Sequence, residues 1–196
     1  MKNERSPDDM SSDVYSEGPR SLQEKHGTIQ LADGLASRFH SSLGIDDVAF
    51  IENVNFFFLA TAGLNGQPQC SYKGGSTGFV DVVSENRLRF PSYDGNGMFL
   101  TAGNISENSR VGMLFIDFDK QTRLRVEGRA TVVEVEPMDQ ITFDIEVEVD
   151  RVFSNCERYI HTLEQKAVSV FIPEKGKEMI QPAWKKRPWL AKLLPK

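Results

Sequence analysis

The sequence predicts a mainly β domain with flanking helices, in which about six antiparallel strands form a closed or partly closed barrel. Alternation of apolar and polar residues, the pattern of a half-buried strand, recurs with short turns from residue 56 to residue 153. Helical spacing interrupts this pattern once, whereas a parallel sheet would alternate strands with helices. The two longest alternating segments, 123–136 and 141–153, each carry one polar face, which is typical of antiparallel strands.

The elements can be justified in chain order. Apolar residues recur at helical spacing between Ser21 and Val54, which predicts two helices. The Asn65-Gly66 pair, a sequence favoured in tight β-turns, joins strands at 56–62 and 69–75 into a hairpin. Further along the chain we expect a second hairpin over 78–90, a helix over Met98–Asn108, and strands at 110–118, 123–136 and 141–153.

The chain is expected to divide into three parts. Residues 1–20 are rich in Ser, Asp, Glu and Pro, so this segment should be flexible. Residues 21–163 should form one barrel domain with N-terminal helices, because a chain of 196 residues with 39% hydrophobic content can build one sizeable core. Residues 164–196 are interpreted as a C-terminal arm. Its basic end, with Trp184 and Trp189, is expected to pack over a neighbouring subunit rather than on a membrane.

Charge and cysteine content exclude several classes of function. A formal net charge of -5 disfavours a general nucleic-acid binder, which normally presents a basic face to phosphates. Cys70 and Cys156, far apart in a chain that starts without a signal peptide, favour a reducing compartment. No segment approaches the roughly 20 apolar residues of a membrane span. The sequence therefore predicts a cytoplasmic protein that binds neither nucleic acid nor membrane.

The stretch FPSYDGNGMFLTAGNIS, residues 90–106, passes from a strand end through two glycines into the expected helix. Polar side chains surround this bare backbone: Ser92, Tyr93, Asp94 and Asn96. The first amides of a helix are unpaired and favour a negative group, so the join could hold an anion. A tight turn would also require glycine. Both interpretations are open.

The stretch CSYKGGSTGF, residues 70–79, poses a similar choice. Ser71 and Lys73 share one face of the expected strand, and glycines follow at positions 74, 75 and 78. Hydroxyl, ammonium and free amide groups are what a phosphate requires. The alternative, which spacing alone favours, is a glycine-rich hairpin with a solvated lysine. Neither of the common nucleotide fingerprints, the dinucleotide-binding glycine pattern or the P-loop, is present.

Two further groups of residues invite a chemical interpretation. Arg123 and Arg125 could reach a phosphate of a ligand, but pairing with the acidic strand at 141–153 is better supported. The segment NCERYIH places Cys156 and His161 close in sequence. A metal site requires about three or four ligands at defined spacing, so none is predicted. We interpret this segment as a helical turn that packs on the barrel.

Taken together, these motifs resemble the pyridoxamine 5'-phosphate oxidase-like family of flavin-binding split barrels. The resemblance covers roughly residues 48–163 and lies in the order of FFFLATAGLNGQPQCSYKGG, GFVDVVSENRLRFPSYDGNGMF, GNISENSRVGMLFIDF, RLRVEGRA and NCERYIH. It implies a six-stranded antiparallel split β-barrel and a homodimer with FMN at the subunit interface. It also implies an oxidoreductase that transfers hydride through flavin N5 to or from a small, unidentified substrate.

The resemblance also nominates cofactor-binding residues, and it assigns no catalytic residue. The strand after the first hairpin and the strand-to-helix join would hold the phosphate and ribityl chain, and the arginine strand would approach the flavin. Arg158 would come from the partner subunit. The nominated residues are Ser71, Lys73, Gly74, Ser92, Tyr93, Asn96, Gly97, Met98, Arg123, Arg125 and Arg158.

The sequence departs from true pyridoxamine 5'-phosphate oxidases at three places. Ser71 lies near the position of an early arginine, and Leu100 and Thr101 lie near that of an Arg-Lys pair. The segment AWKKRPWL does not match the substrate segment of the oxidase, so pyridoxamine phosphate is not expected as the substrate. Two alternatives remain: a flavin-binding or sensing module without turnover, and a split barrel that uses F420 or haem. For haem, His161 is the candidate axial ligand.

Overall fold

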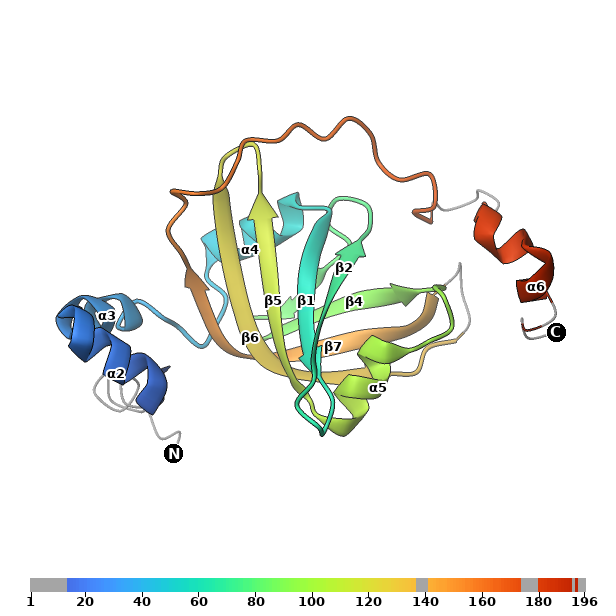
Figure 1. Cartoon of the computed structure of the whole chain (residues 1–196). Helices are drawn as coiled ribbons and strands as arrows, with labels where there is room; N and C mark the ends of the chain where they lie inside the picture. The colour runs from blue at the N-terminus through green and yellow to red at the C-terminus, as the bar shows by residue number, and fades with distance from the viewer. Residues whose placement is uncertain (1–13, 137–140, 174–179, 192, 194–196) are drawn as a thin grey trace.

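The structure is a computed structural model that describes residues 14–136, 141–173, 180–191 and 193 (Figure 1). Within these residues, seven antiparallel strands form one sheet. Residues 1–13 of the segment expected to be flexible lie outside the described residues. The strands are β1 (Phe56–Ala62), β2 (Pro68–Gly74), β3 (Asp81–Ser84), β4 (Arg87–Tyr93), β5 (Arg110–Asp117), β6 (Thr122–Val133) and β7 (Ile141–Ser154).

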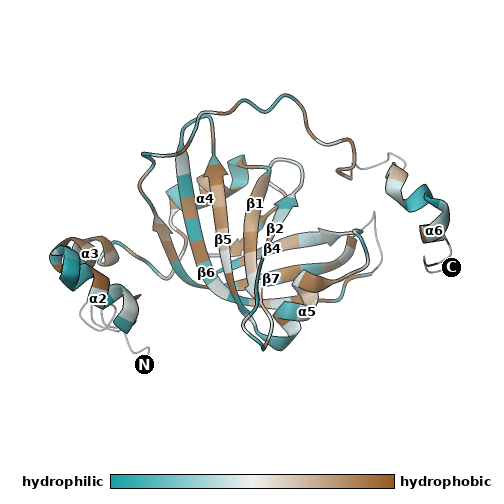
Figure 2. Ribbon diagram, in the orientation of Figure 1, coloured by the Kyte–Doolittle hydropathy of each residue, from teal (hydrophilic) through white to brown (hydrophobic). Residues whose placement is uncertain are grey.

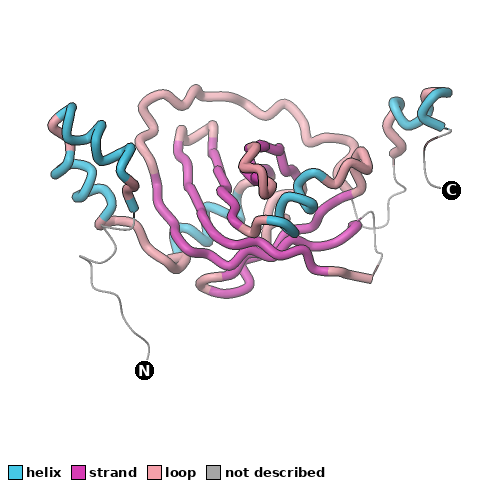
Figure 3. Tube along the Cα trace, turned by 60° about the horizontal axis from the view of Figure 1, so that its bottom comes forward, coloured by secondary structure: helices cyan, strands magenta, loops and turns pink. Residues whose placement is uncertain are grey.

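The sheet has the order β2-β1-β5-β6-β7-β4-β3, so β2 and β3 are its two edges. It curls strongly, as Figure 3 shows, and brings the two ends of the sheet toward each other. The predicted fold class, a mainly β antiparallel barrel with flanking helices, is confirmed. The predicted count of six strands is one too low: the described residues form seven, and the expected hairpin over 78–90 supplies two of them, β3 and β4.

The long strands β6 and β7 pair in the way that their charges predict at Arg129. This residue lies opposite Glu148 and forms ion pairs with Glu148 at 3.3 Å and Asp150 at 3.0 Å. Beside it, the register shifts between Glu127 and Gly128. A Cβ atom at Gly128 would lie 2.2 Å from the carbonyl oxygen of Glu148, so only glycine fits this irregular step.

The preferred interpretation of Arg123 and Arg125 is not supported. Arg125 lies opposite Phe153 rather than a carboxylate, and its guanidinium is 5.9 Å from the centre of the Phe153 ring. Arg123 donates a hydrogen bond to the backbone carbonyl of Cys156 at 2.7 Å. The reason is register: both arginines lie at the start of β6, which pairs with the end of β7, beyond the acidic segment of that strand.

The core lies inside the curl and is rich in phenylalanine. The ring of Phe57 lies 5.0 Å from the rings of both Phe90 and Phe115, and all three side chains are fully buried. Each buried side chain of this size contributes roughly 1.5–3 kcal/mol through the hydrophobic effect. Figure 2 shows the hydrophobic residues concentrated along β1, β4, β5 and β7. This core fixes the strands that carry the candidate site.

Three helices precede the sheet where the sequence predicts two: α2 (Glu17–His26), α3 (Ile29–Ala36) and α4 (Ile45–Asn53). The extra helix arises because Gly27 adopts a left-handed conformation with φ 66°, which ends α2 and starts a new direction. In Figure 1, α2 and α3 project to one side of the barrel, whereas α4 lies against its end. Ile51 of α4 is fully buried in the core.

The helix expected over 98–108 forms as α5 (Leu100–Glu107), two residues later at its start. After β7, the segment expected to be a helical turn makes one hydrogen-bonded turn, from the amide of Ile160 to the carbonyl of Glu157 at 2.9 Å. The chain then continues across the ends of the strands without regular structure. We call residues 155–172 the strap.

The described end of the chain contains two short helical turns, η1 (Ala183–Lys186) and α6 (Pro188–Ala191). Among the described residues, no helix combines the length and the apolar composition that crossing a membrane requires.

Candidate functional site

A polar cavity of about 650 Å³ lies between β2 and the connection from β4 to α5. β2 is one edge of the sheet, and β4 is second from the other edge, so the cavity occupies the seam where the curled sheet does not close. The residues that line it are Gln69, Cys70, Ser71, Tyr72, Lys73, Ser92, Tyr93, Asp94, Gly95, Asn96, Gly97, Phe99, Leu100, Thr101, Ala102, Thr142 and Phe143.

Ser71, Lys73 and Thr101 form the centre of this cavity. Alternation along β2 puts Ser71 and Lys73 on the same side of the strand. The Ser71 hydroxyl is 3.1 Å from that of Thr101, and the Lys73 ammonium donates a hydrogen bond to the same Thr101 oxygen at 3.2 Å. Burial lowers the pKa of Lys73. Among the described residues no carboxylate pairs with Lys73, so this cation is suited to an anionic ligand.

The join from β4 to α5 supplies the second polar feature of the cavity. Gly97 and Phe99 both have positive φ angles, 75° and 50°, which turn the chain sharply from strand to helix. The side-chain oxygen of Asn96 accepts a hydrogen bond from the amide of Met98 at 3.0 Å. No side chain caps α5, and its first residues, Leu100 and Thr101, line the cavity. The join is therefore a tight turn, and it also brings the start of a helix to the cavity.

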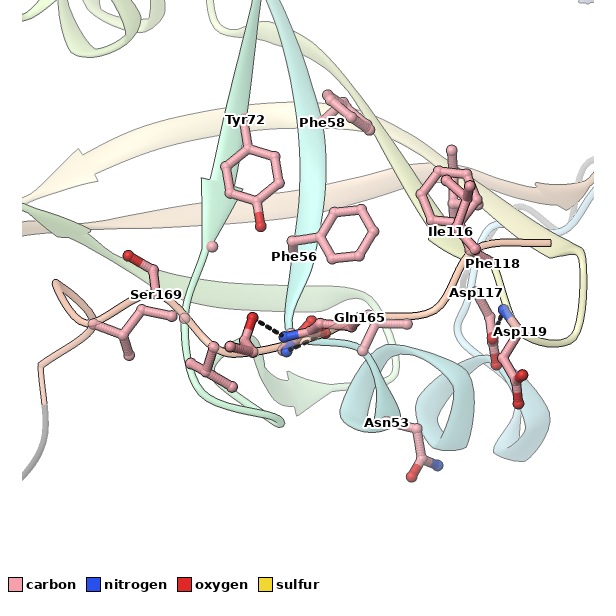
Figure 4. A pocket seen from close by; sticks show the side chains of 18 of the residues that line it. Asn53, Phe56, Phe58, Tyr72, Ile116, Asp117, Phe118, Asp119, Gln165 and Ser169 are labelled. Atoms are coloured by element: carbon pink, nitrogen blue, oxygen red, sulfur yellow. Dashed lines mark hydrogen bonds between the residues drawn. The ribbon is translucent and has the colours of Figure 1, made fainter. Parts of the chain in front are cut away.

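A second, aromatic cavity of about 860 Å³ lies beneath the strap (Figure 4). The ring of Phe56 stacks between Tyr72 at 5.5 Å and Phe118 at 6.0 Å. The residues that line this aromatic cavity are Asn53, Val54, Asn55, Phe56, Phe58, Tyr72, Gly74, Gly75, Tyr93, Ile116, Asp117, Phe118, Asp119, Leu163, Glu164, Gln165, Ala167, Val168, Ser169, Phe171 and Ile172.

Two of the hydrogen bonds made by the strap hold the part of it that lines the aromatic cavity. The side-chain amide of Asn55 donates to the side-chain oxygen of Gln165 at 3.0 Å. The backbone amide of Leu163 donates to the carbonyl of Phe118 at 3.4 Å. Figure 4 shows the bond from the loop before β1 to Gln165. The strap thus completes a cavity whose floor belongs to β1, β2 and β5.

Tyr72 and Tyr93 line both cavities. Tyr72 is 63% exposed and can contact a ligand in either cavity. Burial, followed by the nearby carboxylate of Asp144, raises the pKa of Tyr93. The Tyr93 hydroxyl therefore keeps its proton at neutral pH and can donate a hydrogen bond. These two residues form the wall between a polar space and an aromatic one.

The structure brings six of the nominated residues together in the polar cavity: Ser71, Lys73, Ser92, Tyr93, Asn96 and Gly97. Gly74 lines the aromatic cavity instead. Four other nominated residues, Met98, Arg123, Arg125 and Arg158, line neither of these two cavities.

Sequence reasoning missed the aromatic cavity. Three consecutive phenylalanines, Phe56 to Phe58, could have indicated it, because alternation along a strand places aromatic rings on both faces. Phe57 points into the core and its neighbours line the cavity. The sequence predicts no metal site. Among the described residues, no group of three or more histidine, cysteine, aspartate or glutamate side chains could hold a metal ion.

Comparison with protein families gives the identity of this fold. The family model named pyridoxamine 5'-phosphate oxidase (PNPOx_N) matches residues 47–179. The chain belongs to this family. The curled sheet is accordingly the split barrel of the pyridoxamine 5'-phosphate oxidase-like proteins, as the resemblance implied. No curated protein matches the sequence.

Solved structures of similar proteins cover a little over half of the chain. A protein from Lactobacillus delbrueckii, whose proposed identity is a pyridoxamine 5'-phosphate oxidase, is 23% identical, with a TM-score of 0.48 over 58% of this chain and 95% of that one. HupZ from Group A Streptococcus is 17% identical, with a TM-score of 0.47 over 57% and 92%. HutZ, the heme storage protein from Vibrio cholerae, is 15% identical, with a TM-score of 0.41 over 57% and 94%.

Proposed function

We propose that this protein binds FMN in the polar cavity and works as a flavin-dependent oxidoreductase on a small molecule. Members of its family bind flavin, F420 or haem, and some are oxidoreductases. The observation that supports FMN is the group formed by Lys73, Ser71 and Thr101 beside the start of α5. A cation, two hydroxyls and free helix amides are the groups that bind a phosphate monoester.

The residues present fit an FMN phosphate without the Arg-Lys pair of true pyridoxamine 5'-phosphate oxidases. Thr101 lies near that pair in sequence and contacts Lys73, which comes from β2. Lys73 thus supplies from a neighbouring strand the positive charge that the helix start lacks. The cavity volume of about 650 Å³ lies within the range of roughly 300–1,000 Å³ that is usual for small-molecule sites.

The flavin supplies hydride chemistry when it is bound, and the protein supplies position and electrostatics. Lys73 and Ser71 would hold the phosphate end at β2. Tyr93, which keeps its proton at neutral pH, would donate a hydrogen bond at the wall between the cavities. The aromatic cavity would exclude water and hold the small substrate next to Tyr72 and Tyr93. A flat or apolar substrate suits the rings of Phe56 and Phe118.

We further propose that the protein is a homodimer with the cofactor at the subunit interface. Arg158 is exposed and lines neither cavity of its own chain, and the resemblance assigns it to the partner's site. The cytoplasm is the proposed location, because Cys70 and Cys156 are exposed free thiols, which persist in a reducing compartment.

The first experiment is the visible spectrum of the purified protein, with mass spectrometry of any small molecule released on denaturation. We expect FMN at about one per subunit, and its reduction by NADH or NADPH followed by reoxidation. Size-exclusion chromatography with light scattering tests the dimer. A protein that contains no flavin and acquires none from added FMN would refute the proposal. Flavin that no donor reduces would favour the sensing module.

F420 and haem are the alternatives that the family offers. The haem interpretation relied on His161, which is exposed and lines neither of the two cavities. This placement favours FMN over haem. If haem were bound instead, His161→Ala would change its absorption spectrum, whereas with FMN the same variant should leave the flavin spectrum unchanged.

A further inference from the structure

The polar cavity contains one negative side chain as well as its lysine. Asp94 is the only carboxylate among the described residues that line it. Asp94 belongs to the join between β4 and α5, two residues beyond Ser92 and three before Gly97. A carboxylate at this place repels a phosphate that approaches Lys73, because like charges destabilise each other in a partly desolvated site.

A residue from the far end of the chain neutralises this carboxylate. The ammonium of Lys185, in η1, forms an ion pair with the Oδ2 atom of Asp94. The side chain of Lys185 is 16% exposed, whereas that of Asp94 is 43% exposed. The Lys185 ammonium also lies 5.7 Å from the centre of the Trp184 ring. The side chain of Lys185 thus lies near the ring of Trp184 and contacts Asp94, whereas the neighbouring Lys186 is exposed.

We propose that Lys185 makes the cavity selective for phosphate by neutralising Asp94. This inference rests on the proposed function, because it takes the phosphate of FMN as the ligand of the cavity. Lys185 acts through Asp94 and is a positioning residue. With the pair formed, Lys73 is the remaining net charge of the lining and the site attracts an anion. Without Lys185, the charges of Asp94 and Lys73 cancel.

The same contact links the C-terminal segment to the occupancy of the cavity. If docking of η1 on Asp94 strengthens FMN binding, then bound FMN must strengthen docking of η1 by the same factor, because coupling between two sites is reciprocal. Trypsin cleaves after lysine and arginine unless proline follows, so the segment offers two such positions, after Lys185 and after Lys186, whereas Arg187 precedes Pro188. Saturation with FMN should therefore slow cleavage at these positions, and saturation with riboflavin, which lacks the phosphate, should not.

The test measures the dissociation constants of FMN and riboflavin by quenching of flavin fluorescence. Lys185→Ala should weaken FMN binding about fivefold, the size expected for a partly exposed charge pair, and leave riboflavin binding unchanged. The effect should shrink in about 1 M salt, where charges are screened within a few ångströms. Lys186→Ala, which removes the same charge from the same turn, is the matched control and should equal the wild type.

Two further variants separate an electrostatic role from a structural one. Asp94→Asn removes the charge that Lys185 neutralises, so adding Lys185→Ala to it should cause no further loss of FMN affinity. Lys185→Arg keeps the charge and should retain most of the affinity. Circular dichroism and thermal melting of each variant confirm that the barrel is folded.

The outcomes distinguish this inference from the proposed function. Wild-type protein that binds no FMN would refute the proposed function and this inference with it. Wild-type protein that binds FMN, with equal losses of FMN and riboflavin affinity in Lys185→Ala, would refute only the inference. The same holds if Lys186→Ala weakens FMN binding as much, or if Lys185→Ala still weakens it in the Asp94→Asn background.

Discussion

The polar and aromatic cavities share Tyr72 and Tyr93 but differ in how they are built. The polar cavity combines one lysine, hydroxyls and backbone amides from two short segments, β2 and the β4–α5 join. The aromatic cavity combines stacked rings from β1, β2 and the end of β5 with a strap from much later in the chain. The first offers charge and hydrogen-bonding groups, whereas the second offers apolar surface.

This difference suggests a division of labour between the two cavities. The phosphate of FMN would be selected by charge in the polar cavity, the flavin ring would contact Tyr72 at the shared wall, and the small substrate would be held in the aromatic cavity. FMN and riboflavin differ only in the phosphate, so a pair of titrations with these two molecules can tell whether a given substitution affects phosphate binding or contact with the ring.

The largest expected effect is a loss of FMN affinity when the positive charge of the polar cavity is removed. Lys73→Ala should weaken FMN binding about 10- to 100-fold, because a hydrogen bond to a charged group contributes about 1.5–3 kcal/mol. Riboflavin binding should change little. Fluorescence titration measures both, with Lys186→Ala as a control lysine. A loss of the same size for riboflavin would show that Lys73 does not hold the phosphate.

A smaller effect is expected at the shared wall. Tyr72→Ala should weaken FMN and riboflavin binding equally, by about five- to tenfold, because contact of a flavin ring with an aromatic side chain contributes about 1–1.5 kcal/mol. Tyr72→Phe keeps the ring and should be close to the wild type. If Tyr72→Ala affects FMN alone, the tyrosine belongs to phosphate binding and the division of labour is wrong.

The pH dependence of affinity should follow Lys73. Its folded-state pKa is lowered by burial, so on raising the pH it loses its positive charge earlier than an ordinary lysine does. FMN affinity should therefore be highest near neutral pH and fall severalfold as the solution becomes alkaline. Titrations between pH 7 and about 10 measure this slope. Riboflavin should show no matching decline, and Lys73→Ala should abolish the decline for FMN.

The smallest expected effect concerns the strap. Gln165→Ala removes the hydrogen bond from Asn55, which contributes about 0.5–1.5 kcal/mol at most for a partly exposed pair. Trypsin should then cleave faster after Lys166, which lies next to the lost bond, while FMN affinity remains within about twofold of the wild type. Unchanged cleavage would mean that this bond does not fasten the strap.

Local pattern identified segments that line the polar cavity, although spacing alone favoured a solvated lysine at Lys73, and long-range contacts bring these segments together. Alternation placed Ser71 and Lys73 on one face, and the glycine join predicted the sharp turn before α5. No local pattern could place Thr101 against Lys73, because α5 meets β2 only after the sheet curls. Likewise, Asp94 and Lys185 are separated by 91 positions in the sequence.

The errors of prediction have the same physical origin. The acidic alternation of β7 suggested partners for Arg123 and Arg125, but the register puts them beyond the acidic segment. The strap has no periodicity, because its residues are held by single contacts rather than by a ladder. The sequence analysis therefore divided the strap between the predicted domain, which ends at residue 163, and the predicted arm, which begins at residue 164.

The position of β2 at the border of the sheet has a consequence for solubility. β2 pairs with β1 along its whole length, and no second ladder to another described strand forms on its other side. An edge strand with one open side can template pairing with a second chain, and a lysine on such a strand discourages this association. Lys73 occupies that place. Removal of Lys73 should make the protein more prone to aggregate when the polar cavity is empty, because neither a charged side chain nor a bound ligand would then hinder pairing of another chain with β2.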